Sequence, residues 1–199
     1  SRSWTNPMRK EAKTMRNLLK RISALLLCLL LVLSLPVTAL AEEAQDSEEG
    51  TTLRIARRQQ FLDFAENCRL DSYSRNLSVI LLTDIDLTGV DFSGIPIFCG
   101  NFDGNGHTVS GLSITRDGSN MGLFRYVDAS AVIQNLTVSG KVTPDGSRSA
   151  VGGIAGHNAG KIQNCFFDGT VSGSDDVGGI AGINAITGII DGCHSKGVI

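Results

Sequence analysis

The sequence has 199 residues, of which 42% are apolar and 19% charged, and its formal net charge at pH 7 is −2. The charges are unevenly placed: residues 1–41 are basic, whereas residues 42–199 carry 11 Lys/Arg and 19 Asp/Glu, which argues against nucleic acid as a partner. The 23 glycines and the low aromatic content favour an all-β chain of short strands and tight turns.

The N-terminal forty residues have the pattern of a secretory signal peptide. A basic segment, Met15–Arg21, precedes the apolar run Ile22–Leu35. Small residues follow at Ala39 and Ala41, so we predict cleavage between Ala41 and Glu42. The protein is therefore expected to be secreted or held at the cell surface, with membrane contact only during export.

A membrane anchor is the alternative for this segment. A spanning helix needs about 20 uninterrupted apolar residues, and Ser34, Pro36 and Thr38 interrupt the run. Two interpretations of residues 1–14 stay open: an extension upstream of the signal peptide that results from a misplaced start, or a longer basic region of the signal peptide itself. Residues 42–50 are acidic and lack large apolar side chains, which predicts a flexible spacer.

A single amphipathic helix is predicted next. Within residues 57–68, Phe61, Phe64, Ala65 and Cys68 recur at helical spacing on one face. Short β-prone runs follow from residue 77 onward. A helix ahead of many strands is suited to cap the first turn of a repeat structure, where backbone and apolar side chains would otherwise be exposed.

The strongest signal in the sequence is an internal repeat. The segment Val151–Gly156, Val-Gly-Gly-Ile-Ala-Gly, returns 26 residues later as Val177–Gly182. A period of this length indicates a solenoid. The segment lacks the Lys-Ser/Thr of a phosphate-binding loop, so we expect its glycines to let neighbouring coils approach closely.

Four later segments align with one another and predict a bend in each coil. They begin at Val109, Ile133, Ile162 and Ile190. Their third positions hold only Gly or Asn, the residues that most readily accept positive φ. The predicted bend residues are Gly111, Asn135, Asn164 and Gly192.

The position after each bend predicts a ladder of side chains in the core. Its members are apolar and would stack from coil to coil: Leu112, Leu136, Cys165 and Cys193. Cys165 and Cys193 would be neighbours close enough for a disulfide. We favour free thiols, because Leu fills the same position in the other two segments.

Several of these segments resemble the GLUG-motif proteins of bacterial surfaces. The resemblance rests on Phe102–Val109, Gly122–Phe124, Val151–Gly156 and Ile162–Cys165, and Thr83–Gly89 is similar to what precedes such repeats. It covers residues 51–199. The resemblance implies a right-handed parallel β-helix on a secreted or wall-attached, often adhesin-like protein. It supplies no catalytic residues.

The sequence departs from the motif at Met121–Tyr126, where bulkier residues replace the paired glycines, so that coil is expected to be shaped differently. The complete fold prediction is an all-β, right-handed parallel β-helix over residues 51–199, with a short N-terminal amphipathic capping helix. We also expect this β-helix to be truncated at its C-terminus.

One weak candidate ligand site appears in the sequence. Asp84 and Asp86 are two residues apart and would share a strand face, where they could bind a cation or a sugar. The other acids are scattered and are interpreted as solvating turns. No His-Glu-x-x-His motif is present. We therefore predict no catalytic residue, no cofactor and no metal site.

The sequence thus favours a structural or binding module of a larger, adhesin-like bacterial surface protein. Its partner would be a host or matrix glycan or protein, or a cell-wall component. Two alternatives stay open: a polysaccharide-acting β-helix enzyme, and the non-catalytic leader of a secreted metalloprotease, since GLUG repeats also occur in immunoglobulin A metalloproteases.

Overall fold

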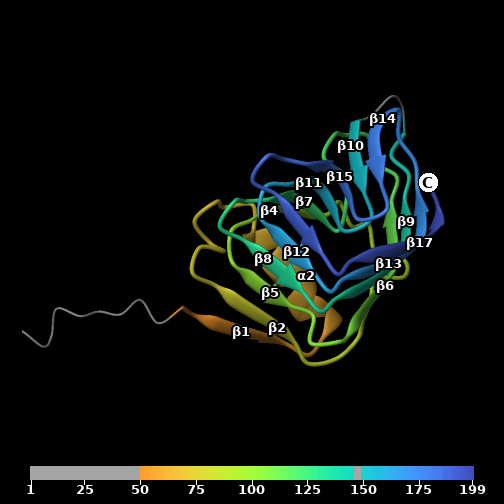
Figure 1. The fold of residues 1–199 in the computed structure, drawn as a ribbon. Helices are drawn as coiled ribbons and strands as arrows, with labels where there is room; N and C mark the ends of the chain where they lie inside the picture. The colour runs from red at the N-terminus through yellow and green to blue at the C-terminus, as the bar shows by residue number, and fades with distance from the viewer. Residues whose placement is uncertain (1–49, 146–148) are drawn as a thin grey trace, which may run out of the picture. The chain divides into compact units, whose positions relative to one another are not determined.

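The computed structural model of the chain describes residues 50–145 and 149–199. The predicted signal peptide, and the predicted spacer except for Gly50, lie outside the described residues. The described part forms a parallel β-solenoid of about five turns with one helix near its N-terminal end (Figure 1). This confirms the predicted fold class.

Parallel strands from successive coils stack into four sheets. A six-stranded sheet contains β1 (Thr52–Ile55), β2 (Ser78–Leu81), β5 (Asn101–Asp103), β8 (Val132–Gln134), β12 (Lys161–Gln163) and β16 (Ile189–Asp191). A five-stranded sheet contains β3 (Ile85–Asp86), β6 (Thr108–Ile114), β9 (Thr137–Val142), β13 (Phe166–Val171) and β17 (His194–Val198). A four-stranded sheet contains β4 (Ile95–Phe98), β7 (Phe124–Val127), β11 (Ala155–Asn158) and β15 (Ala181–Asn184). The fourth sheet pairs β10 (Ser149–Gly152) with β14 (Asp175–Gly178).

The core is built from columns of apolar side chains that stack in register along the solenoid. In the six-stranded sheet, Val79, Phe102, Ile133 and Ile162 occupy paired positions on four neighbouring strands. All four are fully buried. Because side chains alternate across a strand, their neighbours in sequence point outward, and the same few positions make up the core of every coil.

The helix α2 (Arg58–Asn67) covers the N-terminal end of this core. Its buried face contains Phe61, Phe64 and Ala65, as the sequence predicts. The ring of Phe64 lies 5.9 Å, between centroids, from the rings of both Phe98 and Phe102. The strand β1, which the sequence analysis did not predict, precedes the helix and adds an edge strand beside β2.

The predicted bend residues all have positive φ, but they do not all occupy the same place in the coil. The φ angles are 67° at Gly111, 53° at Asn135, 51° at Asn164 and 58° at Gly192. Asn135, Asn164 and Gly192 follow β8, β12 and β16, whose residues pair in register, so these three turn equivalent corners. Gly111 lies inside β6, at a register shift between Val109 and Leu112.

The predicted alignment is therefore wrong for its first segment. Val109 pairs with Val138 rather than with Ile133, and the residue equivalent to Ile133 is Phe102. Leu112 is buried but pairs with Gly140, so it is not in the ladder of Leu136, Cys165 and Cys193. The physical reason is that a β-bulge uses the same left-handed Gly conformation as a corner.

His107 takes the corner position that Leu112 was expected to fill. The carbonyl of His107 accepts a hydrogen bond from the N–H of Thr137, as the carbonyl of Leu136 does from the N–H of Phe166. The corner before it is longer and uses left-handed Asn105 and Gly106. Sequence periodicity missed this corner because its extra residues shift the spacing.

The glycines of the repeated Val-Gly-Gly-Ile-Ala-Gly segment lie where adjacent coils touch. A Cβ atom at Gly156 would overlap the backbone of Asn120 and Met121 in the preceding coil. A Cβ atom at Gly182 would overlap the backbone of Ala150 and Val151 in the same way. The segment is a packing element, as its repetition predicted.

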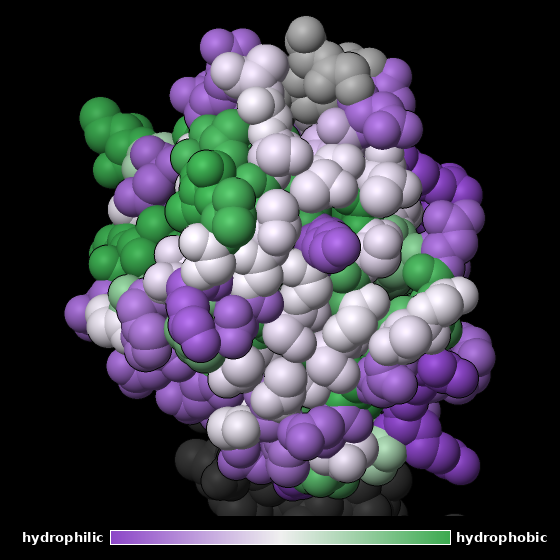
Figure 2. All heavy atoms as spheres, turned by 90° about the vertical axis from the view of Figure 1, so that its right-hand side faces the viewer, coloured by the Kyte–Doolittle hydropathy of each residue, from purple (hydrophilic) through white to green (hydrophobic). Residues whose placement is uncertain are grey.

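The last coil of the described part is covered on one side only. Ile190 is 39% exposed, whereas Ile162, its partner one coil earlier, is fully buried. On the face shown in Figure 2, hydrophobic residues gather at the upper left, and the middle of the face is of intermediate hydropathy. Large exposed apolar residues of this end are Ile186, Ile189, Ile190, Val198 and Ile199.

Candidate functional site

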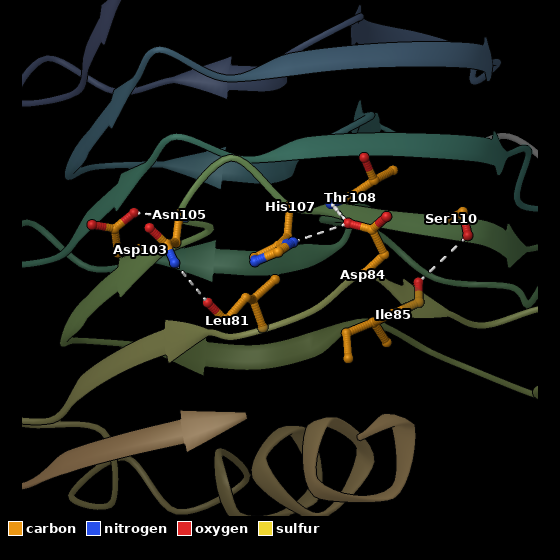
Figure 3. Close-up of polar contacts among 8 residues, drawn as sticks. All are labelled: Leu81, Asp84, Ile85, Asp103, Asn105, His107, Thr108 and Ser110. Carbon is orange, nitrogen blue, oxygen red and sulfur yellow. Dashed lines mark hydrogen bonds and ion pairs between the residues drawn. The ribbon is translucent and has the colours of Figure 1, made fainter. Parts of the chain in front are cut away.

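The predicted pair Asp84 and Asp86 has exposed side chains at β3 of the five-stranded sheet, and Figure 3 shows Asp84 with its polar contacts. Asp84 immediately precedes β3 and has an exposed side chain. Its Oδ1 accepts a hydrogen bond from the N–H of Thr108 at 2.9 Å and lies 3.2 Å from Nδ1 of His107. Both partners belong to the next coil, so this carboxylate links two coils.

Asp86 caps a local turn. Its Oδ1 accepts a hydrogen bond from the N–H of Thr88 at 2.8 Å. The backbone carbonyl of Asp86 accepts a hydrogen bond from the Arg58 guanidinium on α2 at 3.4 Å. Asp84 and Asp86 thus share a strand face, and each is bound to separate groups of the chain itself.

Hydrogen bonds from the chain lower the pKa of both carboxyl groups. For Asp84 the main cause is the Thr108 N–H, with His107 second. For Asp86 the side chain and then the N–H of Thr88 lower the pKa. A carboxylate that is stabilised in this way acts as a fixed structural acceptor rather than as a general acid.

Beside this pair, polar side chains at one corner of the solenoid form hydrogen bonds that link three successive coils. Asp103 Oδ1 accepts a hydrogen bond from the N–H of Asn105 at 2.7 Å. The Asn105 amide donates to the carbonyl of Leu81 in the preceding coil at 3.2 Å. Asp103 also accepts hydrogen bonds from the side chains of Gln134 and Asn135 in the following coil. The corner therefore fixes the stacking of the coils.

The polar contacts continue as a ladder on the outside of the six-stranded sheet. Gln163 Nε2 donates to Gln134 Oε1 at 2.7 Å, and Gln134 Nε2 donates to Asp103 Oδ2 at 3.0 Å. These residues occupy paired positions on β5, β8 and β12. Sequence reasoning did not find this ladder, because it depends on the register and no single residue in it is unusual.

A second column of left-handed residues was also missed. Asn120, Ala150 and Asp176 have φ of 55°, 60° and 52°. Each precedes a residue of the paired series Met121, Val151 and Val177. Asn and Asp favour such a turn, but Ala150 carries no sequence signal for it.

Two clefts lie near the N-terminal end of the solenoid. One, of about 500 Å³, is lined among others by Arg75, Asn101, Cys99 and Ser130. The other, of about 360 Å³, lies along α2. In the first, the Ser130 hydroxyl donates to Oδ1 of Asp128 at 2.8 Å and lies 3.1 Å from the Cys99 carbonyl. The Ser130 hydroxyl in this cleft is therefore already engaged by groups of the chain itself.

The described residues contain neither a cluster of metal-binding side chains nor a helix that could span a membrane. No group of three or more His, Cys, Asp or Glu side chains in residues 50–145 and 149–199 could hold a metal ion. Over the same residues, no helix is both long and apolar enough to span a bilayer.

The geometry defines a repeat protein of parallel coils, in which polar side chains such as Asp103, Gln134 and Gln163 link one coil to the next. Comparison with known proteins shows which sequence family this repeat resembles. Residues 147–172 match the GLUG motif. The matched segment contains β10, β11, β12 and β13, which is one turn of the solenoid. The chain therefore carries a GLUG motif, as its resemblance to GLUG proteins predicted.

Two curated proteins are similar to parts of the chain. Halomucin of Haloquadratum walsbyi is 42% identical over 87 residues, which cover 43% of this chain and 1% of halomucin. A protein named Gly-rich membrane protein, from Evansella cellulosilytica, is 34% identical over 96 residues, which cover 42% of this chain and 11% of that protein. The chain thus matches only a small part of either relative. No solved structure matches it.

Proposed function

We propose that residues 51–199 are a structural and binding module of a secreted, adhesin-like bacterial surface protein. The observation that carries this proposal is the GLUG-bearing solenoid itself, in which successive coils are joined by in-register ladders. Such a fold gives a stiff body with long, repetitive outer faces, which suits a stalk or a binding surface. The similarity to halomucin and to a Gly-rich membrane protein supports a location at the cell surface.

The same geometry weighs against the polysaccharide-acting enzyme. A glycosidase of the usual kind needs two carboxyl groups that flank one bond, with one of them protonated near neutral pH. Asp84 and Asp86 are instead both held ionised by hydrogen bonds from their own chain. We therefore assign them a structural role within the binding module.

Export and binding can be tested with the full chain in a Gram-positive host. The expected product is extracellular and begins at Glu42. Its binding to a panel of matrix glycoproteins, glycans and isolated cell wall is then measured, with turnover of acidic polysaccharides as a parallel assay. Saturable binding without turnover is the expected result. Retention of the chain in the cytoplasm, or turnover that Asp84→Asn abolishes, would contradict the proposal.

A further inference from the structure

The four cysteines of the described part lie in two pairs, one near each end of the solenoid. Cys68 ends α2, and Cys99 follows β4 in the second coil. Cys165 and Cys193 occupy equivalent corners of the last two coils, between paired strands. All four are free thiols in this structure.

In the first pair, both cysteines are hydrogen-bonded to one buried hydroxyl. Ser74 is fully buried, and its Oγ accepts a hydrogen bond from the N–H of Cys99 at 3.0 Å. The same hydroxyl is hydrogen-bonded to the Cys68 thiol. Cys68 is fully buried, whereas Cys99 is 9% exposed and lines the cleft of about 500 Å³. Cys99 is therefore the member of this pair that borders a cleft.

In the second pair, the two thiols are in direct contact. Cys193 Sγ lies 3.4 Å from the backbone nitrogen of Cys165, which donates to it, and the two thiols also interact with each other. Neighbouring parallel strands are about 4.8 Å apart, which falls within the Cα separation of disulfides. Cys165 is buried and Cys193 is half-buried. This pair also has one accessible and one sheltered member.

We propose that Cys68 with Cys99, and Cys165 with Cys193, are two disulfide-forming pairs that fasten the two ends of the solenoid, with a low-molecular-weight disulfide as oxidant. The less buried cysteine of each pair, Cys99 or Cys193, loses its proton, attacks the small disulfide as a thiolate and releases one small thiol. The buried partner then loses its proton and attacks the mixed disulfide, which releases the second small thiol. Each pair loses two protons and two electrons, and one small disulfide is reduced to two thiols.

Burial determines the order of these two steps. Burial raises the pKa of Cys68 and of Cys165 to about 12, so both stay protonated and protected from reagents in solution. Burial raises the pKa of Cys99 as well, but Cys99 borders the cleft, where a small disulfide can reach it. They react only after their accessible neighbour holds the mixed disulfide beside them. One disulfide then ties the capping helix to the second coil, and the other ties the last coil to the one before it.

The test uses the full chain carrying Cys28→Ser, incubated without oxygen in oxidised glutathione, then alkylated under denaturing conditions and mapped by mass spectrometry. The expected crosslinks are Cys68 to Cys99 and Cys165 to Cys193. Oxidation should also raise Tm by roughly 5–10 °C, reversibly on addition of a reductant. The proposal is overturned if the thiols stay free, stop as glutathione adducts, or pair in another way.

Two further variants separate the pairs and guard against a loss of folding. In Cys68→Ser, Cys99 should stop as a glutathione adduct while Cys165 and Cys193 still close. In Cys193→Ser, Cys165 should stay unmodified while Cys68 and Cys99 still close. A glutathione adduct on the buried Cys165 in that variant would contradict the proposed order of attack. The inference goes beyond the proposed function, and neither outcome alters the export and binding assay.

Discussion

At the scale of single residues, the solenoid depends on two kinds of position. At some, the backbone must adopt a positive φ; at others, a neighbouring coil lies too close for any side chain. Asn135, Asn164 and Gly192 turn equivalent corners in the left-handed region. The sequence predicted these because few residues adopt that conformation. Ala150 adopts it as well, and no sequence rule could have found it, since the surrounding coils impose the conformation on an unfavourable residue.

Substitution of Gly156 tests whether the close approach of neighbouring coils requires glycine. We expect Gly156→Ala to lower the free energy of unfolding by about 3 kcal/mol or more, because the methyl group would overlap the backbone of the preceding coil. Gly89→Ala is the matched control. Nothing lies near a Cβ atom there, and only its positive φ of 75° costs stability, by about 1–2 kcal/mol. Equal losses in urea unfolding would show that close packing is not the reason for the glycine.

The carboxylates that cap turns predict an acid-sensitive fold. Hydrogen bonds from Ser130, first from its N–H and then from its hydroxyl, hold the pKa of Asp128 below its ordinary value of 3.8, and those of Asp84 and Asp86 are lowered too. A lowered folded-state pKa means that the unfolded chain takes up protons first as the pH falls. Stability should therefore be full above the ordinary pKa and be lost progressively as the pH falls below it.

Urea unfolding between pH 7 and pH 2.5 measures this loss directly. In Asp128→Asn, part of the stability should be missing at pH 7 and the decline at acid pH should be shallower. A decline at acid pH as steep in Asp128→Asn as in the original chain would rule out this role for Asp128.

At the scale of elements, the capping helix was predictable and the first strand was not. Four apolar residues at helical spacing identify α2 without reference to the rest of the chain. The four residues of β1 alternate in burial only because they pair with β2, and four alternating residues are too few to distinguish a strand from a loop. The bulge at Gly111 misled the alignment for a similar reason, since two different elements use the same glycine conformation.

The cap should contribute strongly to stability through its aromatic contacts. Phe64 is buried against Phe98 and Phe102, so Phe64→Ala should lower the free energy of unfolding by about 3–5 kcal/mol. Leu70 lies just after the helix and is 68% exposed, so Leu70→Ala should change it by less than about 0.5 kcal/mol. Equilibrium urea unfolding followed by circular dichroism compares the two. A small loss for Phe64→Ala would mean that the helix does not close the core.

At the scale of the whole molecule, the repeat made the solenoid predictable from the sequence, whereas the contacts of the candidate site were not. The 26-residue return of Val151–Gly156 predicted a solenoid, and the pairing of Val151 with Val177 shows those segments stacked. The candidate site was less predictable, because whether Asp84 is free to bind a ligand depends on Thr108 and His107, which only the register brings beside it.

The last described coil exposes apolar side chains, which predicts self-association when residues 1–199 are produced on their own. Its apolar side chains and the free edges of β16 and β17 can pair with a second copy. Sedimentation velocity should show concentration-dependent oligomers, and Ile190→Lys combined with Val198→Lys should reduce them. Leu82→Lys, at an exposed position near the other end, should not. A monodisperse monomer of the unmodified chain at high concentration would refute this prediction.

The central claim is a stack of parallel coils in one fixed register, and interstrand contacts measured by NMR in solution test it most directly. The structure predicts amide contacts that join Phe166 to Thr137 in one neighbouring coil and to His194 in the other. It also predicts contacts that join Ile162 to Ile133 and Ile190. Observation of these four contacts would establish the solenoid and its register. Antiparallel contacts, or contacts displaced by even one residue, would contradict it.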